Sequence, residues 1–141
     1  MTLDMRTIKF RGKCCHSDAW AYGNLVDYEE EECPEIQGFD VFREGRDVWQ
    51  EIDVERDTVG QFTGLHDKNG KGIYEGDIVE VYDFTSVYAS KYQGVVKMIH
   101  CTWVVEYEWM FGISHPNLSF DDFAERKTEV IGNIYDDEQL V

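Results

Sequence analysis

This sequence lacks long apolar runs, has only two prolines and is short of basic side chains. Its apolar stretches fall far short of the ~20 residues that a membrane-spanning helix needs, so we expect no contact with a membrane. Residues 1–12 contain no apolar segment of the kind found in secretory signals, which predicts a cytoplasmic protein. The 13 Lys and Arg stand against 29 Asp and Glu. This shortage argues against direct binding to nucleic acid, because phosphate contacts need basic side chains.

Residue patterns that support metal binding or nucleophilic catalysis are also missing. Cys14, Cys15 and His16 are adjacent and Cys33 lies further on, whereas zinc-binding cysteines are usually separated by two to four residues. The histidines fall in unrelated contexts, and neither a Gly-x-Ser-x-Gly elbow nor a phosphate-binding loop is present. We therefore expect no metal, no cofactor and no catalytic residue, and hence no enzyme. In a reducing cytoplasm the four cysteines are expected to be free thiols.

The sequence does contain many aromatic and apolar residues in a strongly acidic chain. Its 141 residues are 43% hydrophobic and 14% aromatic, which is enough for a buried core and favours strands over helices. The formal net charge of -16 fits a solvated surface, a basic partner or mimicry of a nucleic acid. Alternating segments predict a mainly β protein. We expect a hairpin over about residues 6–28, short strands within 39–54 around the turn 44–46, and further strands over 94–100, 102–110 and 129–135.

One short helix is predicted over residues 119–127. Ser119 suits the N-cap, and acidic residues follow it while Arg126 and Lys127 close the segment, as the helix dipole favours. Phe120, Phe123 and Ala124 have the spacing of one buried face.

The most structured stretch is Thr58–Val81, which reads as strand, turn, turn and strand. The Asn69-Gly70 pair favours positive φ at both positions of a hairpin loop. A second turn lies at Glu75–Asp77, where the Asp77 carboxylate is expected to accept local backbone hydrogen bonds. The β-rich run that follows, with Gly94–Lys97 later in the chain, is a pattern common in SH3-like barrels.

This stretch resembles the core motif of the YopX family, a group of small proteins encoded mainly by phages and prophages. The resemblance implies a mostly β architecture with an SH3-like barrel element, a bacterial host cell and no known catalytic residues. We accordingly expect a single YopX-like domain over 1–141, with the hairpin at 6–28, an SH3-like core at 54–112 and the helix and last strand at 119–135. The matching segments are Thr58–Leu65, Asp67–Lys71, Ile73–Val79, Lys9–Lys13, Trp20, Tyr22–Gly23 and Glu129–Tyr135.

Candidate binding residues are few, and each has a structural alternative. The run Glu29, Glu30, Glu31 and Glu32 is either a solvated loop or a contact for a basic partner. Gln61 lies in an otherwise apolar motif, where it can satisfy buried backbone groups. The tryptophans form either an aromatic binding face or, as we favour, part of the core; they are Trp20, Trp49, Trp103 and Trp109. Trp103 and Trp109 share one aromatic face of the strand predicted over 102–110, which is expected to be core or an oligomer contact.

Two functional hypotheses follow from these patterns. The first is a non-enzymatic binding or self-assembling module of a phage or prophage that forms a homo-oligomer or binds a host or phage protein. The second is an acidic inhibitor or nucleic-acid mimic that occupies a basic host protein, which requires carboxylates gathered on one face. An enzyme would instead need a pocket with convergent polar groups.

Overall fold

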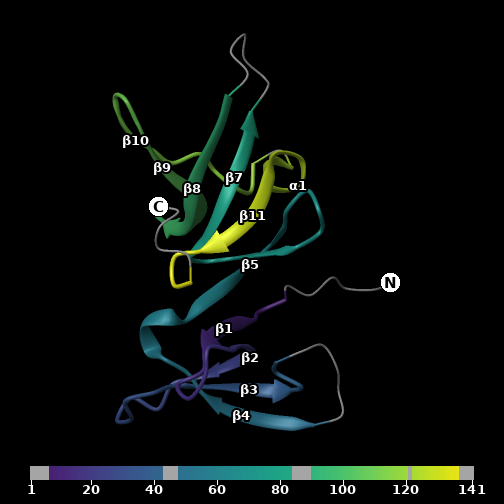
Figure 1. Cartoon of the computed structure of the whole chain (residues 1–141), viewed down its shortest axis with the longest axis vertical. Helices are drawn as coiled ribbons and strands as arrows, with labels where there is room; N and C mark the ends of the chain where they lie inside the picture. The colour runs from purple at the N-terminus through teal and green to yellow at the C-terminus, as the bar shows by residue number, and fades with distance from the viewer. Residues whose placement is uncertain (1–6, 43–47, 84–89, 121, 137–141) are drawn as a thin grey trace. The chain divides into compact units, whose positions relative to one another are not determined.

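The computed structural model describes residues 7–42, 48–83, 90–120 and 122–136 (Figure 1). The chain divides into two compact units, unit 1 at Met1–Phe62 and unit 2 at Thr63–Val141. Both units are built mainly from antiparallel strands, which confirms the predicted fold class at that level. The single domain over 1–141 stays a prediction. Within the described residues no helix is long and apolar enough to cross a bilayer.

Unit 1 is an antiparallel meander of four strands, joined by the start of a fifth. The predicted N-terminal hairpin is present, because β1 pairs with β2 around a turn in which the Cys14 N–H donates to the Ala19 carbonyl at 2.9 Å. After a 3-10 turn at Arg56–Thr58, the first residues of β5 pair with β1. The strands, in the order β4-β3-β2-β1-β5, are β1 Phe10–Lys13, β2 Trp20–Val26, β3 Glu35–Phe39, β4 Trp49–Asp53 and β5 Gly60–His66.

The core of unit 1 is small and depends on close approach of the strands. It consists of Ala21, Ile36, Val41 and Val54, all almost fully buried. Burial of each Val or Ile side chain contributes roughly 1.5–3 kcal/mol. A Cβ at Gly23 would lie 2.6 Å from the Gln37 carbonyl oxygen, so only glycine lets β2 and β3 meet here.

Unit 2 holds a five-stranded antiparallel sheet in the order β10-β9-β8-β7-β11, and β6 lies beside the second half of β5. Buried valines of β7, β8 and β9 form its core together with Ile73, Leu118 and Ala124. Within the described residues both sheets are open, so the predicted SH3-like barrel is not confirmed. The strands are β6 Gly72–Tyr74, β7 Asp77–Asp83, β8 Ser90–Ile99, β9 Thr102–Trp109, β10 Gly112–Ser114 and β11 Thr128–Asn133.

The central stretch folds as strand, turn, turn and strand, as predicted. The Asp77 carboxylate accepts the Tyr74 N–H at 2.7 Å and is almost fully buried, which confirms its structural role. The first turn differs from the prediction, because Gly70 has positive φ and Asn69 does not. The reason is the Asp67 carboxylate, whose Oδ1 accepts the N–H groups of both Asn69 and Lys71 at 2.9 Å and so fixes a different turn.

The helix is shorter than predicted. Helix α1 spans only Phe123–Lys127, and its N-cap is Asp122 in the left-handed conformation. Ser119 instead bonds to the Asn117 side chain. Ala124 is buried as predicted, but Phe120 is 70% exposed, because the helix begins only after it. Asp121 lies outside the described residues.

Of the two strands predicted within residues 39–54, the second is present as β4, whereas the first lies earlier in the chain, as β3. Strand β3 ends at Phe39 because Asp40 takes a left-handed conformation, and β4 begins at Trp49. The expected turn at 44–46 falls outside the described residues. The positions of β3 and β4 decide which of their side chains lie on the same side of the sheet.

Candidate binding surfaces

The exposed side of β3 and β4 brings aromatic and acidic residues together. The strands pair antiparallel with Phe39 opposite Trp49, Gln37 opposite Glu51 and Glu35 opposite Asp53. Because side chains alternate along a strand, these odd-numbered residues share one side. The even-numbered Ile36 and Ile52 point into the core of unit 1. We call this surface the acidic aromatic face; it comprises Glu35, Gln37, Phe39, Trp49, Glu51 and Asp53, with Tyr28 beside them.

The aromatic part of this face is a pair of half-exposed rings. Phe39 is 54% exposed and Trp49 is 48% exposed. Their ring centroids are 5.1 Å apart in an edge-to-face arrangement. The Trp49 Nε1–H donates to Glu51 Oε1 at 3.4 Å, so an acidic group lies directly beside the indole. Exposed aromatic rings are enriched in binding surfaces.

The acidic part of the face has no basic neighbour on its own strands. Residues 27–35 and 49–55 contain no Lys or Arg. The Gln37 side chain donates to Glu35 Oε1 at 3.3 Å and to the Tyr28 hydroxyl at 3.5 Å. The Glu35 carboxylate raises the pKa of Tyr28 chiefly by charge repulsion of the phenolate. Every charged side chain of β3, β4 and residues 27–34 is therefore acidic.

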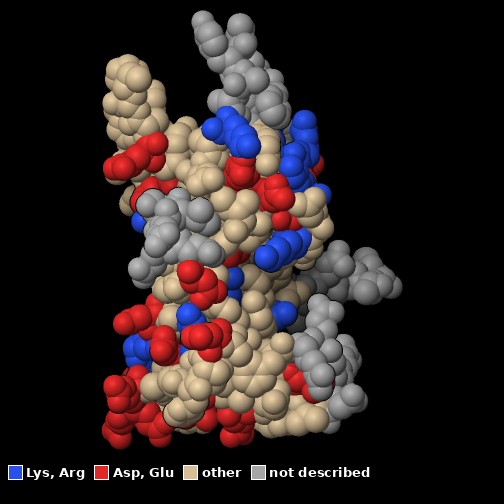
Figure 2. Space-filling model, viewed as in Figure 1, with Lys and Arg blue, Asp and Glu red and all other residues tan. Residues whose placement is uncertain are grey.

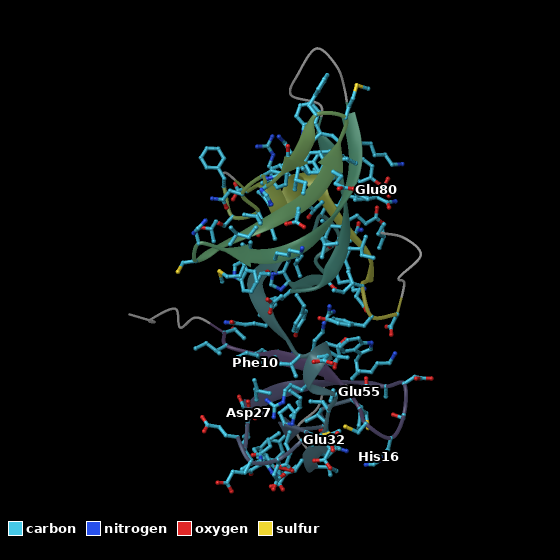
Figure 3. The ribbon with its side chains drawn as sticks, turned by 90° about the vertical axis from the view of Figure 1, so that its left-hand side faces the viewer. Phe10, His16, Asp27, Glu32, Glu55 and Glu80 are labelled. Carbon is cyan, nitrogen blue, oxygen red and sulfur yellow. The ribbon has the colours of Figure 1, made fainter. Side chains whose placement is uncertain are left out.

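The loop between β2 and β3, residues 27–34, extends this acidity, and we call it the acidic loop. Glu29, Glu30, Glu31 and Glu32 are all exposed, as predicted. Arg56 anchors the loop: its guanidinium binds the Asp27 carboxylate through two bonds at 2.7 and 2.9 Å and the Glu31 carbonyl at 3.0 Å. These bonds lower the pKa of Asp27. In Figure 2 acidic side chains lie over the part of the chain that holds β2, β3 and β4 as well as over unit 2, and Figure 3 labels Asp27, Glu32 and Glu55 of unit 1.

Strand β4 lies at the edge of its sheet within the described residues. The Val54 N–H donates to the Pro34 carbonyl at 3.0 Å and the Asp40 N–H to the Val48 carbonyl at 2.7 Å. Even-numbered residues of β4 are therefore the ones that hydrogen-bond to β3, and the peptide groups of Trp49 and Glu51 point to the open side. An extended segment could add to the sheet there.

A second exposed aromatic surface lies at the end of the β9–β10 hairpin, and we call it the hairpin tip. It consists of Trp109, Met110, Phe111 and Ile113, which are 50%, 88%, 78% and 55% exposed. The rings of Trp109 and Phe111 are 5.2 Å apart, again edge to face. Trp103 and Val105, on the same strand, pack in the core of unit 2. The predicted aromatic face of this strand is therefore core at one end and exposed at the other.

The other predicted candidates in unit 1 lie outside the acidic aromatic face. Trp20, at the start of β2, is half-buried with the Arg11 guanidinium 4.9 Å from its ring centroid. Gln61 is half-buried on β5 opposite Phe10 of β1. Of the predicted residues, only Trp49 belongs to the acidic aromatic face, and Glu29–Glu32 lie in the adjoining acidic loop. Sequence reasoning missed Phe39, Glu35, Glu51 and Asp53, because only the β3–β4 register places them together.

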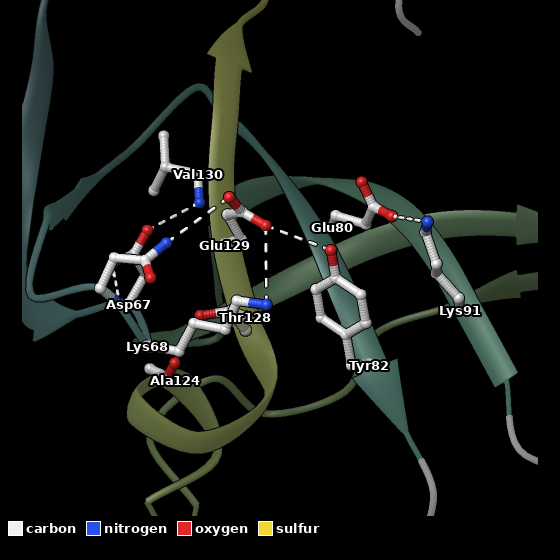
Figure 4. Close-up of polar contacts among 10 residues, drawn as sticks. Asp67, Lys68, Glu80, Tyr82, Lys91, Ala124, Thr128, Glu129 and Val130 are labelled. Atoms are coloured by element: carbon white, nitrogen blue, oxygen red, sulfur yellow. Dashed lines mark hydrogen bonds and ion pairs between the residues drawn. The ribbon is translucent and has the colours of Figure 1, made fainter.

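A polar cluster in unit 2 is structural (Figure 4). The Asp67 carboxylate, almost fully buried, accepts the Val130 N–H at 2.9 Å, and the Lys68 N–H donates to the Thr128 carbonyl at 2.9 Å. The Glu129 carboxylate accepts the Tyr82 hydroxyl at 3.1 Å. Burial and this bond raise the pKa of Tyr82. The cluster fastens the β5–β6 turn to β11.

Unit 2 also has an open hollow of about 340 Å³, lined by parts of β7, β8, β9 and β10. At its rim the Glu106 carboxylate binds Lys97 Nζ at 2.6 Å and His115 Nε2 at 3.0 Å. These bonds lower the pKa of Glu106. The three groups are occupied with one another and partly exposed, so they form an ion-pair network without a poised nucleophile. Among the described residues no group of three or more His, Cys, Asp or Glu could hold a metal ion.

Comparison with known proteins identifies a family. A family model described as YopX protein matches residues 9–141. A search of curated proteins found no match. Among solved structures, the chain is similar to the crystal structure of protein EF1440 from Enterococcus faecalis, at 20% sequence identity over 96% of this chain and 99% of that chain, with a TM-score of 0.44. A likeness at this level supports no inference about function.

Proposed function

The chain belongs to the YopX family, and from this premise we propose that it is a non-enzymatic binding module that holds a Lys- and Arg-rich segment of another protein. The binding surface is the acidic aromatic face. The observation that carries the proposal is the exposed Phe39–Trp49 pair beside Glu51 and Asp53 on an edge strand. The family resemblance implies that a phage or prophage encodes this protein, and we therefore expect the partner to be a basic protein of the host or of the phage.

The chemistry of the face matches a basic segment in two ways. Arg and Lys pack favourably on aromatic rings, worth roughly 0.5–1 kcal/mol at exposed sites. Carboxylates beside those rings accept charge-assisted hydrogen bonds from the same side chains. The net charge of -16 speeds the encounter with a basic partner, and salt screens that effect.

The backbone of β4 favours an extended partner. A segment that adds to the open side of β4 bonds to the peptide groups of Trp49 and Glu51, and every second side chain then lies on the same side as the acidic aromatic face. A sequence that alternates basic and small polar residues therefore fits better than one with its basic residues in a block.

Fluorescence anisotropy with labelled peptides tests this proposal. We expect binding of a peptide in which Arg alternates with Thr, weaker binding of a composition-matched peptide with its Arg residues in one block, and none when Glu replaces Arg. Binding should weaken as salt is raised. Equal binding of the protein to all three peptides, or no binding of the Arg peptides, would refute the proposal.

A second candidate function is self-association through the hairpin tip. Exposure of Trp109, Met110, Phe111 and Ile113 together forms an apolar surface of the kind that protein contacts cover. Two copies that pack these tips against each other would form a symmetric dimer. Sedimentation velocity tests this directly, and a monomer across the micromolar range would rule it out.

A further inference from the structure

Two cysteines that are distant in sequence meet at the end of β4. Cys15 lies in the turn between β1 and β2, and Cys33 lies in the acidic loop, 18 residues later. Their Sγ atoms are 3.2 Å apart, and both residues are half-buried. The other two cysteines are not part of this pair: Cys14 Sγ accepts the His16 N–H at 3.5 Å, and Cys101 is exposed in unit 2.

The backbone holds the two thiols together. The Cys15 N–H donates to the Asp53 carbonyl at 3.0 Å, and the Pro34 carbonyl, next to Cys33, accepts the Val54 N–H at 3.0 Å. Consecutive residues of one strand thus fix both segments. A disulfide needs an S–S distance near 2.05 Å, so the sulfurs must approach by only about 1 Å, a movement within reach of side-chain rotation.

We propose that Cys15 and Cys33 form a reversible disulfide that fastens the acidic loop to the turn between β1 and β2. This inference does not depend on the proposed function. In the first step the Cys33 thiolate attacks a low-molecular-weight disulfide of the glutathione class, forms a mixed disulfide and releases one small thiol. Cys15 then loses its proton to solvent and attacks the Cys33 sulfur, which closes the bridge and releases the second thiol. Two protein thiols are oxidised, and one small disulfide is reduced to two thiols.

The order of these steps follows from the surroundings of Cys15. In the reduced pair, burial, the hydrogen bond to Cys33 and the charge of Cys33 raise the pKa of Cys15 to about 12, and the negative charges of Asp53 and Glu55 add to this shift. Its S–H points at the Cys33 sulfur, so Cys33 reacts first. Only the thiolate is nucleophilic. Burial and the negative charges of Asp53 and Glu55 still raise the pKa of Cys15 when Cys33 is in the mixed disulfide, so bridge closure is slow at neutral pH. Its rate should rise about tenfold per pH unit, in step with the thiolate fraction of Cys15.

The effect of the bridge falls on the acidic loop. In the reduced protein the loop is anchored at Asp27 and Glu31 by Arg56. The disulfide adds a covalent anchor on the other side of the glutamate run, next to Pro34. Oxidation would thus hold Glu29–Glu32 in place without changing their charge.

Incubation of the full folded chain with oxidised glutathione, followed by alkylation, digestion and mass spectrometry, tests the proposal. We expect one peptide pair linked through Cys15 and Cys33, reversed by dithiothreitol, and about a tenfold faster closure at pH 8 than at pH 7. Cys14→Ser should keep the bridge. Cys33→Ser should lose it and leave Cys15 as a thiol. In denaturant the same treatment should give mixed linkages that include Cys14 and Cys101.

Three results would overturn it. The first is a folded protein that carries only stable mixed disulfides, with Cys15 unmodified. The second is a bridge between Cys14 and Cys33. The third is a protein whose Cys15 and Cys33 remain unreacted after overnight exposure, while the exposed Cys101 reacts and proves that the oxidant is active.

Discussion

The acidic aromatic face and the hairpin tip contain nearly the same aromatic pair in opposite surroundings. Phe39 and Trp49 are 5.1 Å apart with an interplanar angle of 79°, and Trp109 and Phe111 are 5.2 Å apart with the same angle. The two tryptophans are 48% and 50% exposed. Trp49 donates a hydrogen bond to Glu51, whereas the large exposed hydrophobic residues next to Trp109 and Phe111 are Met110 and Ile113.

The difference teaches that a half-exposed tryptophan has no fixed role by itself. Next to carboxylates, an aromatic ring and a negative potential together favour a cation. Next to methionine and isoleucine, the same ring favours a dry apolar contact. The two surfaces should therefore respond independently to mutation, and four experiments test that separation.

The largest effect should come from the hairpin tip. Trp109→Ser together with Phe111→Ser removes two exposed aromatic anchors, each worth about 2 kcal/mol in an interface. The dissociation constant of the dimer should therefore rise by roughly 1000-fold. Sedimentation velocity measures this change. Trp49→Ser is the matched control and should leave the dimer intact. Equal weakening by the control would mean that the tip is not the contact.

Charge reversal on the acidic aromatic face should give the next largest effect. Glu51→Lys with Asp53→Lys places like charges opposite a basic peptide, at a cost of roughly 2–3 kcal/mol, so its affinity should fall by about 100-fold in the anisotropy measurement. Glu108→Lys with Glu125→Lys makes the same change in net charge in unit 2 and should leave the affinity nearly unchanged. A similar loss in both proteins would show that only net charge matters.

Removal of the Trp49 ring should have a moderate effect. Trp49→Ala forfeits a cation–π contact of roughly 0.5–1 kcal/mol, which corresponds to an affinity about two- to fivefold lower. Trp49→Phe should recover most of it, and Trp109→Ala should change nothing. Unaltered affinity in Trp49→Ala would remove the aromatic part of the proposal and leave only the carboxylates.

The smallest effect concerns the pH response of Tyr28. Because Glu35 raises the pKa of Tyr28 in the folded protein, the phenol contributes a little stability below its ordinary pKa of about 10. That contribution is lost as the pH rises through the folded pKa. Glu35→Gln should shift the titration of Tyr28 downward. Near-UV absorbance follows it, with Tyr28→Phe to identify the signal, and an unchanged titration in Glu35→Gln would contradict the assigned cause.

Local patterns in the sequence were sufficient for several features. The hairpin of β1 and β2 and the turn at Asp77 were predicted because turn residues act through backbone bonds to near neighbours. Exposure of Glu29–Glu32 was predicted because four adjacent carboxylates repel one another and stay solvated. Family membership was recognised from the residues of the central stretch and its flanking motifs.

Features that depend on distant contacts were not predictable in this way. The Asn69 conformation depends on the Asp67 carboxylate, which also bonds to Val130 far along the chain. Helix α1 begins at Phe123, one turn later than the capping residues and the apolar spacing predicted, and Phe120 is therefore exposed. The predicted barrel required strand pairings that a list of strands cannot specify.

The sequence by itself determined that this protein is β-rich and acidic and that it belongs to the YopX family, because composition, period and motif are local properties. Only the tertiary structure decided that Phe39, Trp49 and Glu51 share one face and that Cys15 meets Cys33. The physical reason is register. A shift of β4 by one residue against β3 would send Trp49, Glu51 and Asp53 to the opposite side of the sheet from Phe39, and register is set by pairing and core packing across the sheet.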